Sequence, residues 1–240
     1  MPKLKMPENS LQQPATTNFN NSKILRSQEC PQDSSLDLTS RHQCERFREV
    51  VTIVTALFKV VLMGDGSVGK TTLRKVYMGE GFRAQYMITI GADFAVKKMH
   101  LEGGHDVSIQ IWDLAGQEHF KSVRSTFYKG AQGALTVYST VERASFDNLP
   151  NWLNECWTNS GKKIPIVLIG NKTDLREQFK DNPVMRQTIV TTQEGQKYAE
   201  AISRTGVHCS FLETSAKTGE NVEAAFLELA IKILEAGGMV

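Results

Sequence analysis

Apolar and polar positions follow two different periods along most of the chain, and the change between them predicts its elements. Residues 58–63 form a mostly apolar run, typical of a buried strand, and residues 72–77 that follow have a helical pattern. From residue 58 onward the two patterns take turns, as they do in α/β folds with a parallel sheet. Further strands are expected at 133–138, 164–169 and 211–213, and helices at 119–129, 144–158, 192–203 and 220–235.

One pair of predicted strands runs antiparallel. Apolar residues at 107, 109 and 111 alternate with other residues, a second strand pattern covers 94–98, and Gly103-Gly104 lies between the two. This arrangement is typical of a β-hairpin, which would give an otherwise parallel sheet one antiparallel edge. Pro150 falls inside the 144–158 helix pattern, so we expect it in the first turns of a helix or at a kink.

The chain before residue 58 has a different character. Residues 1–40 are rich in Ser, Asn, Gln, Thr and Pro, which predicts a disordered N-terminal extension. Residues 41–57 carry apolar side chains at spacings of three and four, as an amphipathic lead-in helix would. The four consecutive β-branched residues at 50–53 are equally consistent with an extended lead-in. A single globular domain is expected over residues 58–240.

Composition narrows the class of protein. A chain of 240 residues with 40% hydrophobic and 22% charged residues suits one ordinary domain plus an extension. The formal net charge of +2 is too small to favour nucleic acid as a partner. The four cysteines are scattered without a C-x-x-C pair, so a reduced, cytoplasmic setting is expected.

The stretch with the clearest chemistry runs from Gly64 to Thr71 and reads G-D-G-S-V-G-K-T. It matches the phosphate-binding P-loop, and it has the required strand before it and helix after it. Glycines let successive backbone N–H groups turn towards phosphate oxygens, and the helix N-terminus adds its dipole. Lys70 can reach the β- and γ-phosphates, and the Thr71 hydroxyl can bind Mg²⁺. The predicted phosphate-binding residues are Gly64, Asp65, Gly66, Ser67, Val68, Gly69, Lys70, Thr71 and Thr72.

A second motif, W-D-L-A-G-Q-E at 112–118, ends the second strand of the hairpin. Asp113 suits a carboxylate that supports Mg²⁺, and Gly116 can donate its N–H to a γ-phosphate. Gln117 is expected to orient an attacking water, while Lys70 stabilises developing charge. Gly66 is expected to lie against the γ-phosphate, where any Cβ would crowd Gln117 and an arginine entering from an activating partner.

Two later motifs follow strands 164–169 and 211–213, and they predict which base is bound. The Asp174 carboxylate of Asn171-Lys172-Thr173-Asp174 can accept hydrogen bonds from N1–H and the 2-amino group of guanine, a pair that adenine lacks. Ser215-Ala216-Lys217 could donate backbone N–H groups to guanine O6. The ends of parallel strands gather at one edge of a doubly wound sheet, where such folds bind ligands.

Together with T-I-G-A-D-F at 89–94, these motifs resemble those of Ras-superfamily small GTPases of the Rab type, over about residues 58–235. The resemblance implies a P-loop NTPase G domain: an α/β fold with a mostly parallel six-stranded sheet, one antiparallel edge hairpin and helices on both faces. It also implies that Thr71 and Thr89 bind Mg²⁺, that Phe82 packs on the guanine and that Asp174 reads the base. Residues 82–93 and 115–126 would be switch loops that respond to GTP or GDP. Effector proteins, an exchange factor and a GTPase-activating protein are the implied partners.

Some residues depart from the family pattern. The last cysteine is Cys209, whereas Rab proteins usually end in prenylated cysteines, so no direct lipid anchor is expected. Membrane attachment would then be peripheral, through a partner or through the possible helix at 44–57. The G-A-D-F-A variant at 91–95 is similar to Rab-like GTPases found in archaea, and residues 175–191 form a longer segment than usual, expected as a surface insertion. Two alternatives remain open from the sequence: a P-loop phosphotransferase and a nucleotide-bound scaffold that does not hydrolyse.

Overall fold

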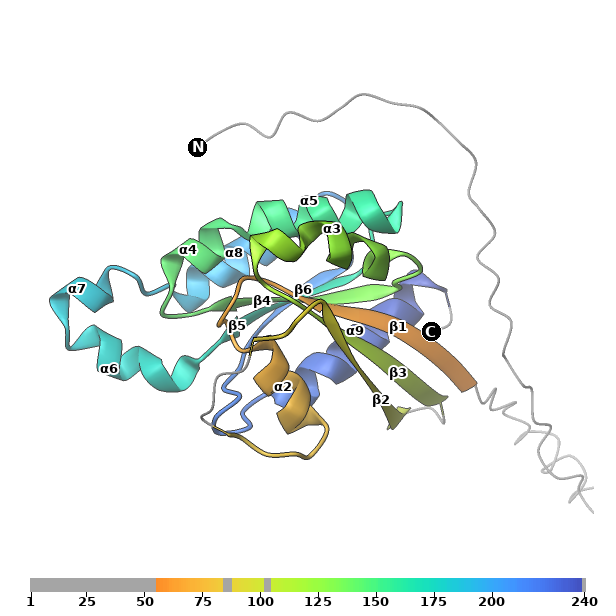
Figure 1. Ribbon diagram of the computed structural model, residues 1–240, viewed down its shortest axis with the longest axis horizontal. Helices are drawn as coiled ribbons and strands as arrows, with labels where there is room; N and C mark the ends of the chain where they lie inside the picture. The colour runs from red at the N-terminus through yellow and green to blue at the C-terminus, as the bar shows by residue number, and fades with distance from the viewer. Residues whose placement is uncertain (1–54, 84–87, 102–104, 239–240) are drawn as a thin grey trace, which may run out of the picture.

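The structure is a computed structural model, and it describes residues 55–83, 88–101 and 105–238 (Figure 1). The predicted disordered extension and most of the lead-in segment therefore lie outside the described residues. Strand β1 begins at Thr55, so residues 55–57, which the lead-in helix was expected to include, are extended. Their backbone pairs with β3, beginning at Thr55 opposite Asp106, and this pairing explains why the strand starts before residue 58.

The described residues form a six-stranded mixed sheet, as predicted. Neighbouring strands pair in the order β2-β3-β1-β4-β5-β6, and only the β2–β3 hairpin is antiparallel. The hairpin is therefore at one edge of the sheet, and β1, which leads into the P-loop, lies inside it. The strands are β1 (Thr55–Met63), β2 (Ala92–Leu101), β3 (His105–Leu114), β4 (Gly133–Ser139), β5 (Ile166–Asn171) and β6 (Cys209–Glu213).

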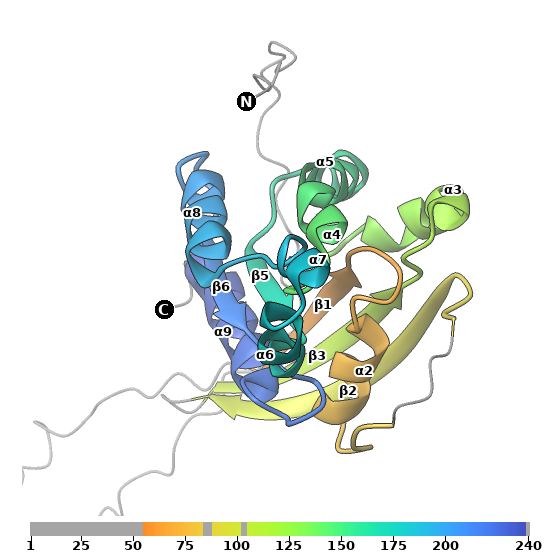
Figure 2. The same cartoon turned by 90° about the vertical axis from the view of Figure 1, so that its left-hand side faces the viewer.

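Helices cover both faces of the sheet, as the alternating pattern predicts. In Figure 1, α3, α4, α5 and α8 lie above the sheet and α2 and α9 below it, and the side view in Figure 2 separates the two layers. The strands are apolar towards both layers, since β4 and β5 are buried along their whole length. The main helices are α2 (Lys70–Tyr77), α5 (Leu149–Ser160), α8 (Thr192–Ser203) and α9 (Val222–Ala236).

Two predicted helices are broken. In place of one helix at 119–129 the chain forms η1 (Glu118–Phe120), α3 (Lys121–Arg124) and η2 (Ser125–Tyr128). The 144–158 pattern divides at Asn148 into α4 (Arg143–Asp147) and α5. Pro150, which cannot donate a backbone N–H, lies in the first turn of α5, as expected.

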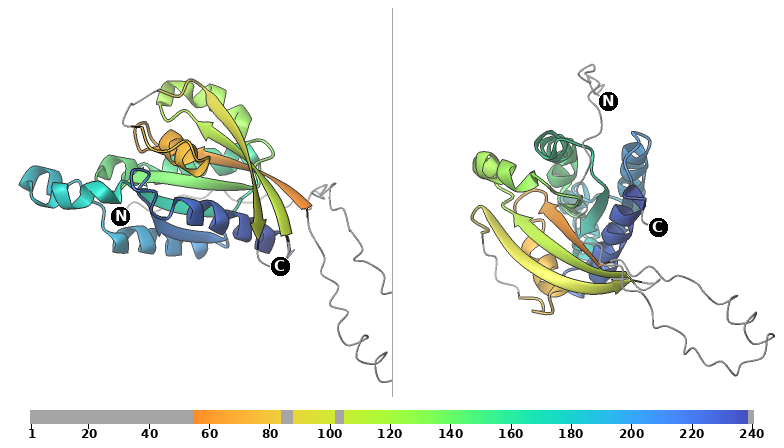
Figure 3. Two further views of the ribbon diagram at one scale, coloured as in Figure 1. Left: turned by 90° about the horizontal axis from the view of Figure 1, so that it is seen from below. Right: turned by 90° about the vertical axis from the view of Figure 1, so that its right-hand side faces the viewer.

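Residues 175–191, predicted to be a surface insertion, are mostly exposed. They begin at the last residue of η3 (Thr173–Leu175) and include α6 (Arg176–Lys180) and α7 (Pro183–Arg186). Figures 1 and 3 show α6 and α7 extending beyond the rest of the domain. The guanidinium of Arg176 forms an ion pair with Glu213 of β6, and Arg143 forms one with Glu194 at the start of α8. Glu194 also completes a capping box with Thr191, so the insertion returns to the domain at a well-defined helix start. Among the described residues, no helix is long and apolar enough to cross a membrane.

Candidate functional site

The P-loop turns sharply between β1 and α2. Gly64 and Gly69 have positive φ angles, and a Cβ on Gly64 would lie 2.0 Å from the carbonyl oxygen of Val137. A Cβ on Gly69 would lie 2.3 Å from the side-chain nitrogen of Asn171. Both positions therefore require glycine, because backbone strain and direct collision act together. The loop also wraps Lys70, whose Nζ donates to the carbonyl oxygens of Gly64 (2.8 Å) and Asp65 (2.7 Å).

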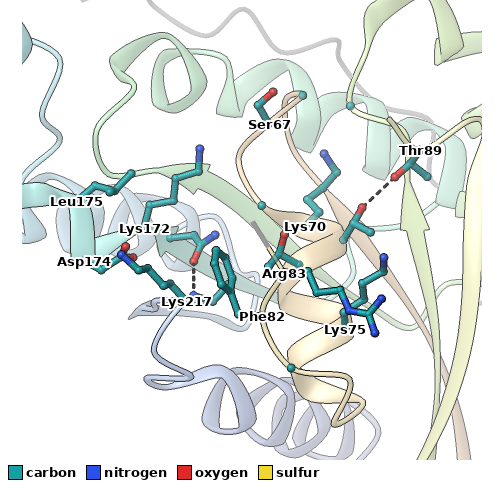
Figure 4. A pocket seen from close by; sticks show the side chains of 18 of the residues that line it. Ser67, Lys70, Lys75, Phe82, Arg83, Thr89, Lys172, Asp174, Leu175 and Lys217 are labelled. Atoms are coloured by element: carbon teal, nitrogen blue, oxygen red, sulfur yellow. Dashed lines mark hydrogen bonds between the residues drawn. The ribbon is translucent and has the colours of Figure 1, made fainter. Parts of the chain in front are cut away.

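This loop forms one wall of a cavity of about 450 Å³ at the carboxyl ends of the parallel strands. Figure 4 shows Phe82 near the middle of the view, with Lys172, Asp174 and Lys217 on one side of it and Lys70 and Thr89 on the other. The motifs predicted from sequence thus meet around one space, of the size that holds a small ligand. Predicted site residues that line it are Gly66, Ser67, Gly69, Lys70, Thr71, Thr72, Phe82, Thr89, Gly116, Gln117, Asn171, Lys172, Asp174, Ala216 and Lys217.

Three oxygen-bearing side chains converge on the Lys70 side of the cavity. The Thr71 hydroxyl lies 2.9 Å from the Thr89 hydroxyl and donates to Asp113 Oδ2 at 2.6 Å. Asp113 is completely buried, and its Oδ1 has no hydrogen-bond partner among the described residues. Hydroxyl and carboxylate oxygens of this kind, with an acceptor left over, fit Mg²⁺, which keeps several water ligands and needs few protein ones. No group of three or more His, Cys, Asp and Glu side chains is clustered for a metal in the described ranges.

Burial controls the charges here. Loss of water around Lys70 lowers its pKa to about 8, although the nearby carboxylates of Asp113 and Asp65 act in the opposite direction. Burial also raises the pKa of Asp113, opposed by the Thr71 hydrogen bond and the charge of Lys70. Lys70 lines the cavity, and phosphate oxygens bound there would favour its charged form.

The opposite side of the cavity is built around Asn171. Its side chain donates to Val68 O (2.8 Å) and accepts from the Thr214 hydroxyl (3.0 Å) and the Ala216 N–H (3.2 Å). Asn171 therefore joins the P-loop to the loops that follow β5 and β6. The Ser215 hydroxyl donates to Asp174 Oδ1 at 2.6 Å, which orients the carboxylate predicted to read the base. Burial lowers the pKa of Lys172 in this wall.

The Gln117 segment closes tightly against the P-loop. A Cβ on Gly116 would lie 2.4 Å from the backbone nitrogen of Gly66, so only glycine permits this approach. A Cβ on Gly66 would lie 3.8 Å from Gln117 Nε2, which is an ordinary contact distance. The prediction that any Cβ at Gly66 crowds Gln117 is therefore wrong, since a bare methyl group fits and a larger side chain would be needed.

Comparison with known proteins identifies the fold and the site together. The model of the Ras family matches residues 59–235, which is most of the chain and includes every motif around the cavity. The chain belongs to the Ras family. It is similar to the Ras-related proteins RABA1b of Arabidopsis thaliana and rab-11.1 of Caenorhabditis elegans, each 40% identical over 177 residues. Those matches cover 74% of this chain, and 75% and 77% of the two relatives. Ras-related protein Rab-9A of Rattus norvegicus is 40% identical over 184 residues, covering 75% of this chain and 84% of the relative.

As a Rab-type member of the Ras family, the protein is a GTP-binding switch that hydrolyses GTP to GDP, with Mg²⁺ as cofactor. Guanine nucleotide is its ligand, and regulators and effectors are its general classes of partner. This decides against the phosphotransferase and the non-hydrolysing scaffold that the sequence left open.

Five predicted residues of the Ras-family site lie behind the lining of the cavity. The backbone carbonyls of Gly64 and Asp65 accept from Lys70, and that of Val68 accepts from Asn171. The side chains of Asp113 and Ser215 form hydrogen bonds to Thr71 and Asp174, which do line the cavity.

Four lining residues were not among the predicted binding residues, although Arg83 belongs to the predicted 82–93 loop: Lys75, Gly81, Arg83 and Leu175. Lys75 follows Thr71 by four positions on α2, so helical spacing could have found it. The other three are sequence neighbours of Phe82 or Asp174. Helical spacing and chain proximity were therefore the signals available for these positions.

Proposed function

We propose that three segments carry the nucleotide signal in this protein: the P-loop and the loops 82–93 and 115–126. The observation that supports this most directly is the contact of the Thr71 hydroxyl with both Thr89 and Asp113. One atom of the P-loop helix thereby meets Thr89 of the 82–93 loop and Asp113 of β3, which lies two residues before the 115–126 loop. A change in the nucleotide bound beside this hydroxyl would therefore alter the contacts that hold both loops.

In this proposal the P-loop backbone and Lys70 bind the phosphates, while Asp174 recognises N1–H and the 2-amino group of guanine. Phe82 covers the base, and the Ala216 and Lys217 backbone lies near O6. Asn171 contributes chiefly by joining the P-loop to the loops that follow β5 and β6, since its amide nitrogen and oxygen both form hydrogen bonds to protein groups. Thr71 and Thr89 would bind Mg²⁺, and Asp113 would support it through water ligands. The ion, when bound, neutralises charge on the β- and γ-phosphates.

Replacing Thr71 with Asn tests the magnesium assignment. The variant loses the hydroxyl that would bind Mg²⁺, and the ion would offset phosphate charge, of which GTP carries more than GDP. Affinity for GTP should therefore fall more than affinity for GDP, by roughly tenfold, the value of one lost charge-assisted contact. Equilibrium titration with fluorescent GDP and a non-hydrolysable GTP analogue measures both. Thr158→Asn, the same change at an exposed position of α5, is the control. Equal loss for the two nucleotides would contradict the assignment.

For hydrolysis we propose that Gln117 orients the attacking water and that Lys70 stabilises charge on the transferred phosphate. Gly66 keeps the space beside Gln117 clear of a large side chain. The Gly116 N–H would contact the γ-phosphate, so loss of that phosphate on hydrolysis would release the 115–126 loop.

The surface read by effectors is proposed to lie over β2, β3 and the two loops. Apolar side chains are exposed there at Ile88, Ile90, Phe94, Val96 and Val123. Trp112 lies between Phe94 (ring centroids 4.9 Å apart) and Phe127 (5.2 Å), which links the hairpin to η2. Exposed apolar side chains gathered over neighbouring elements are typical of protein-binding sites.

Amide hydrogen exchange tests the switch assignment. Peptides covering 82–93 and 115–126 should be protected by about tenfold or more with a GTP analogue bound relative to GDP, because γ-phosphate contacts order them. Peptides from α8 are the internal control and should exchange equally in both forms. Equal exchange of the two loops in both states would refute their role as switches.

We also propose a cytoplasmic protein that reaches membranes only through a partner. Tight binding of the isolated full chain to plain phospholipid vesicles in a sedimentation assay would rule this out.

A further inference from the structure

Arg124, the last residue of α3, is a buried cation that none of the nucleotide motifs contains. Its side chain is 1% exposed. Its Nε and Nη2 donate to the two carboxylate oxygens of Glu155 in α5, at 2.5 and 2.8 Å. The Tyr128 hydroxyl donates to the same carboxylate at 3.1 Å. A planar guanidinium paired in this forked way has a fixed orientation, so Arg124 is held rigidly against α5.

The remaining nitrogen of that guanidinium, Nη1, contacts the backbone around Gln117. Nη1 donates to the backbone carbonyl of Gln117 at 2.7 Å and lies 3.4 Å from that of Ala115. These two residues flank Gly116, the glycine whose approach to Gly66 leaves no room for a Cβ. The guanidinium thus fixes the backbone on both sides of the closest contact between the 115–126 loop and the P-loop.

Helix α5, which holds Glu155, also contacts the P-loop. The Trp152 ring lies 4.3 Å from the guanidinium carbon of Arg124, and its indole N–H donates to Asp65 Oδ1 at 2.5 Å. Asn148, immediately before α5, donates to the same oxygen at 2.6 Å. Helix α5 is therefore attached to the P-loop through Asp65 and to the Gln117 backbone through Arg124.

We propose that Arg124 is a positioning residue for GTP hydrolysis, which sets the Gln117 backbone at a fixed place relative to the P-loop by way of α5. The inference rests on the proposed role of Gln117. Arg124 does not line the nucleotide cavity, so it acts through Gln117 and not on the nucleotide. Buried ion pairs are often no more stabilising than apolar residues of the same volume, so stability alone is a weak reason for this one. A lysine carries the same charge but has no fork, and it cannot bind Glu155 at two points while donating to Gln117.

The test is single-turnover hydrolysis of GTP preloaded on the full chain, in the parent and in Arg124→Lys. A misplacement of catalytic groups by about 1 Å can cost as much as 10²-fold, so a slowing of roughly tenfold or more is expected. Dissociation of fluorescent GDP should change by less than about twofold, because no lining residue is altered. Arg143→Lys is the matched control. Arg143 also holds a carboxylate by both oxygens and donates to a backbone carbonyl, that of Ile189, but far along the chain from Gln117. It should hydrolyse at the parent rate.

A double variant separates positioning from general stabilisation. In a Gln117→Leu background, Arg124→Lys should cause no further slowing, because the group it positions is gone. Equal slowing with and without Gln117, or a parent rate in Arg124→Lys, would overturn the inference. If Arg124→Lys does not fold, Glu155→Gln replaces it, with the same expected slowing and the same contrary result. A parent rate in Gln117→Leu alone would instead refute the proposed function, so the two failures are distinguishable.

Discussion

Gln117→Leu should bind GTP as the parent does and hydrolyse it about 10²-fold more slowly, the usual contribution of one group that guides proton and water in a transition state. Leucine fills a similar volume beside the P-loop but cannot form hydrogen bonds to water. Gln117 lines the cavity, and its Nε2 is the nearest atom to a Cβ built on Gly66, so it lies on the phosphate side. Single-turnover release of phosphate measures the rate, and titration with a GTP analogue measures affinity.

A control distinguishes loss of mechanism from loss of stability. Gln193→Leu makes the same change at an exposed position of α8, and it should leave the rate unchanged. If Gln117→Leu hydrolyses GTP as fast as the parent, both alone and with cell extract as a source of activating protein, then another group must position the water.

Asp174→Asn should change the preferred base from guanine towards xanthine. The substitution exchanges an acceptor for a donor opposite the 2-amino group of guanine, and xanthine has a carbonyl at that place. Sites that depend on buried polar pairing discriminate by roughly 10⁴-fold when one partner is missing, so the selectivity ratio should shift on that scale. The Ser215 hydroxyl already binds one carboxylate oxygen, which keeps the side chain oriented for this role. Competition between GDP and XDP for the parent and the variant measures the ratio.

Asp181→Asn provides the comparison, because Asp181 is an exposed carboxylate at the end of α6, a few residues beyond Asp174. It should leave base selectivity as it is in the parent. Retention of the parent's preference for guanine by Asp174→Asn would mean that Asp174 does not read the base.

The sequence by itself determined the architecture and the chemical class. The P-loop, the 112–118 motif and the base-reading motifs are each contiguous, and each follows an apolar strand pattern. Local composition and the edge rule for parallel sheets were therefore enough to bring them to one place. Helix α8, expected at 192–203, begins and ends at those residues, and the Thr191–Glu194 capping box is a local signal for its start. The expectation failed over 119–129, where hydrogen bonds from Arg124 to Glu155, Gln117 and Ala115 accompany a set of short turns in place of one helix.

Only the tertiary structure decided how the motifs are joined. Asn171 contacts Val68 across 103 residues, and Trp152 contacts Asp65 across 87. Arg124 and Glu155 are separated by 31 residues and lie in different elements. No local pattern encodes such pairings, because an arginine or tryptophan in an amphipathic segment has the same periodicity whether it faces solvent or a buried carboxylate. Packing of α5 between the P-loop and the 115–126 loop selects the partner, and with it the position of Gln117.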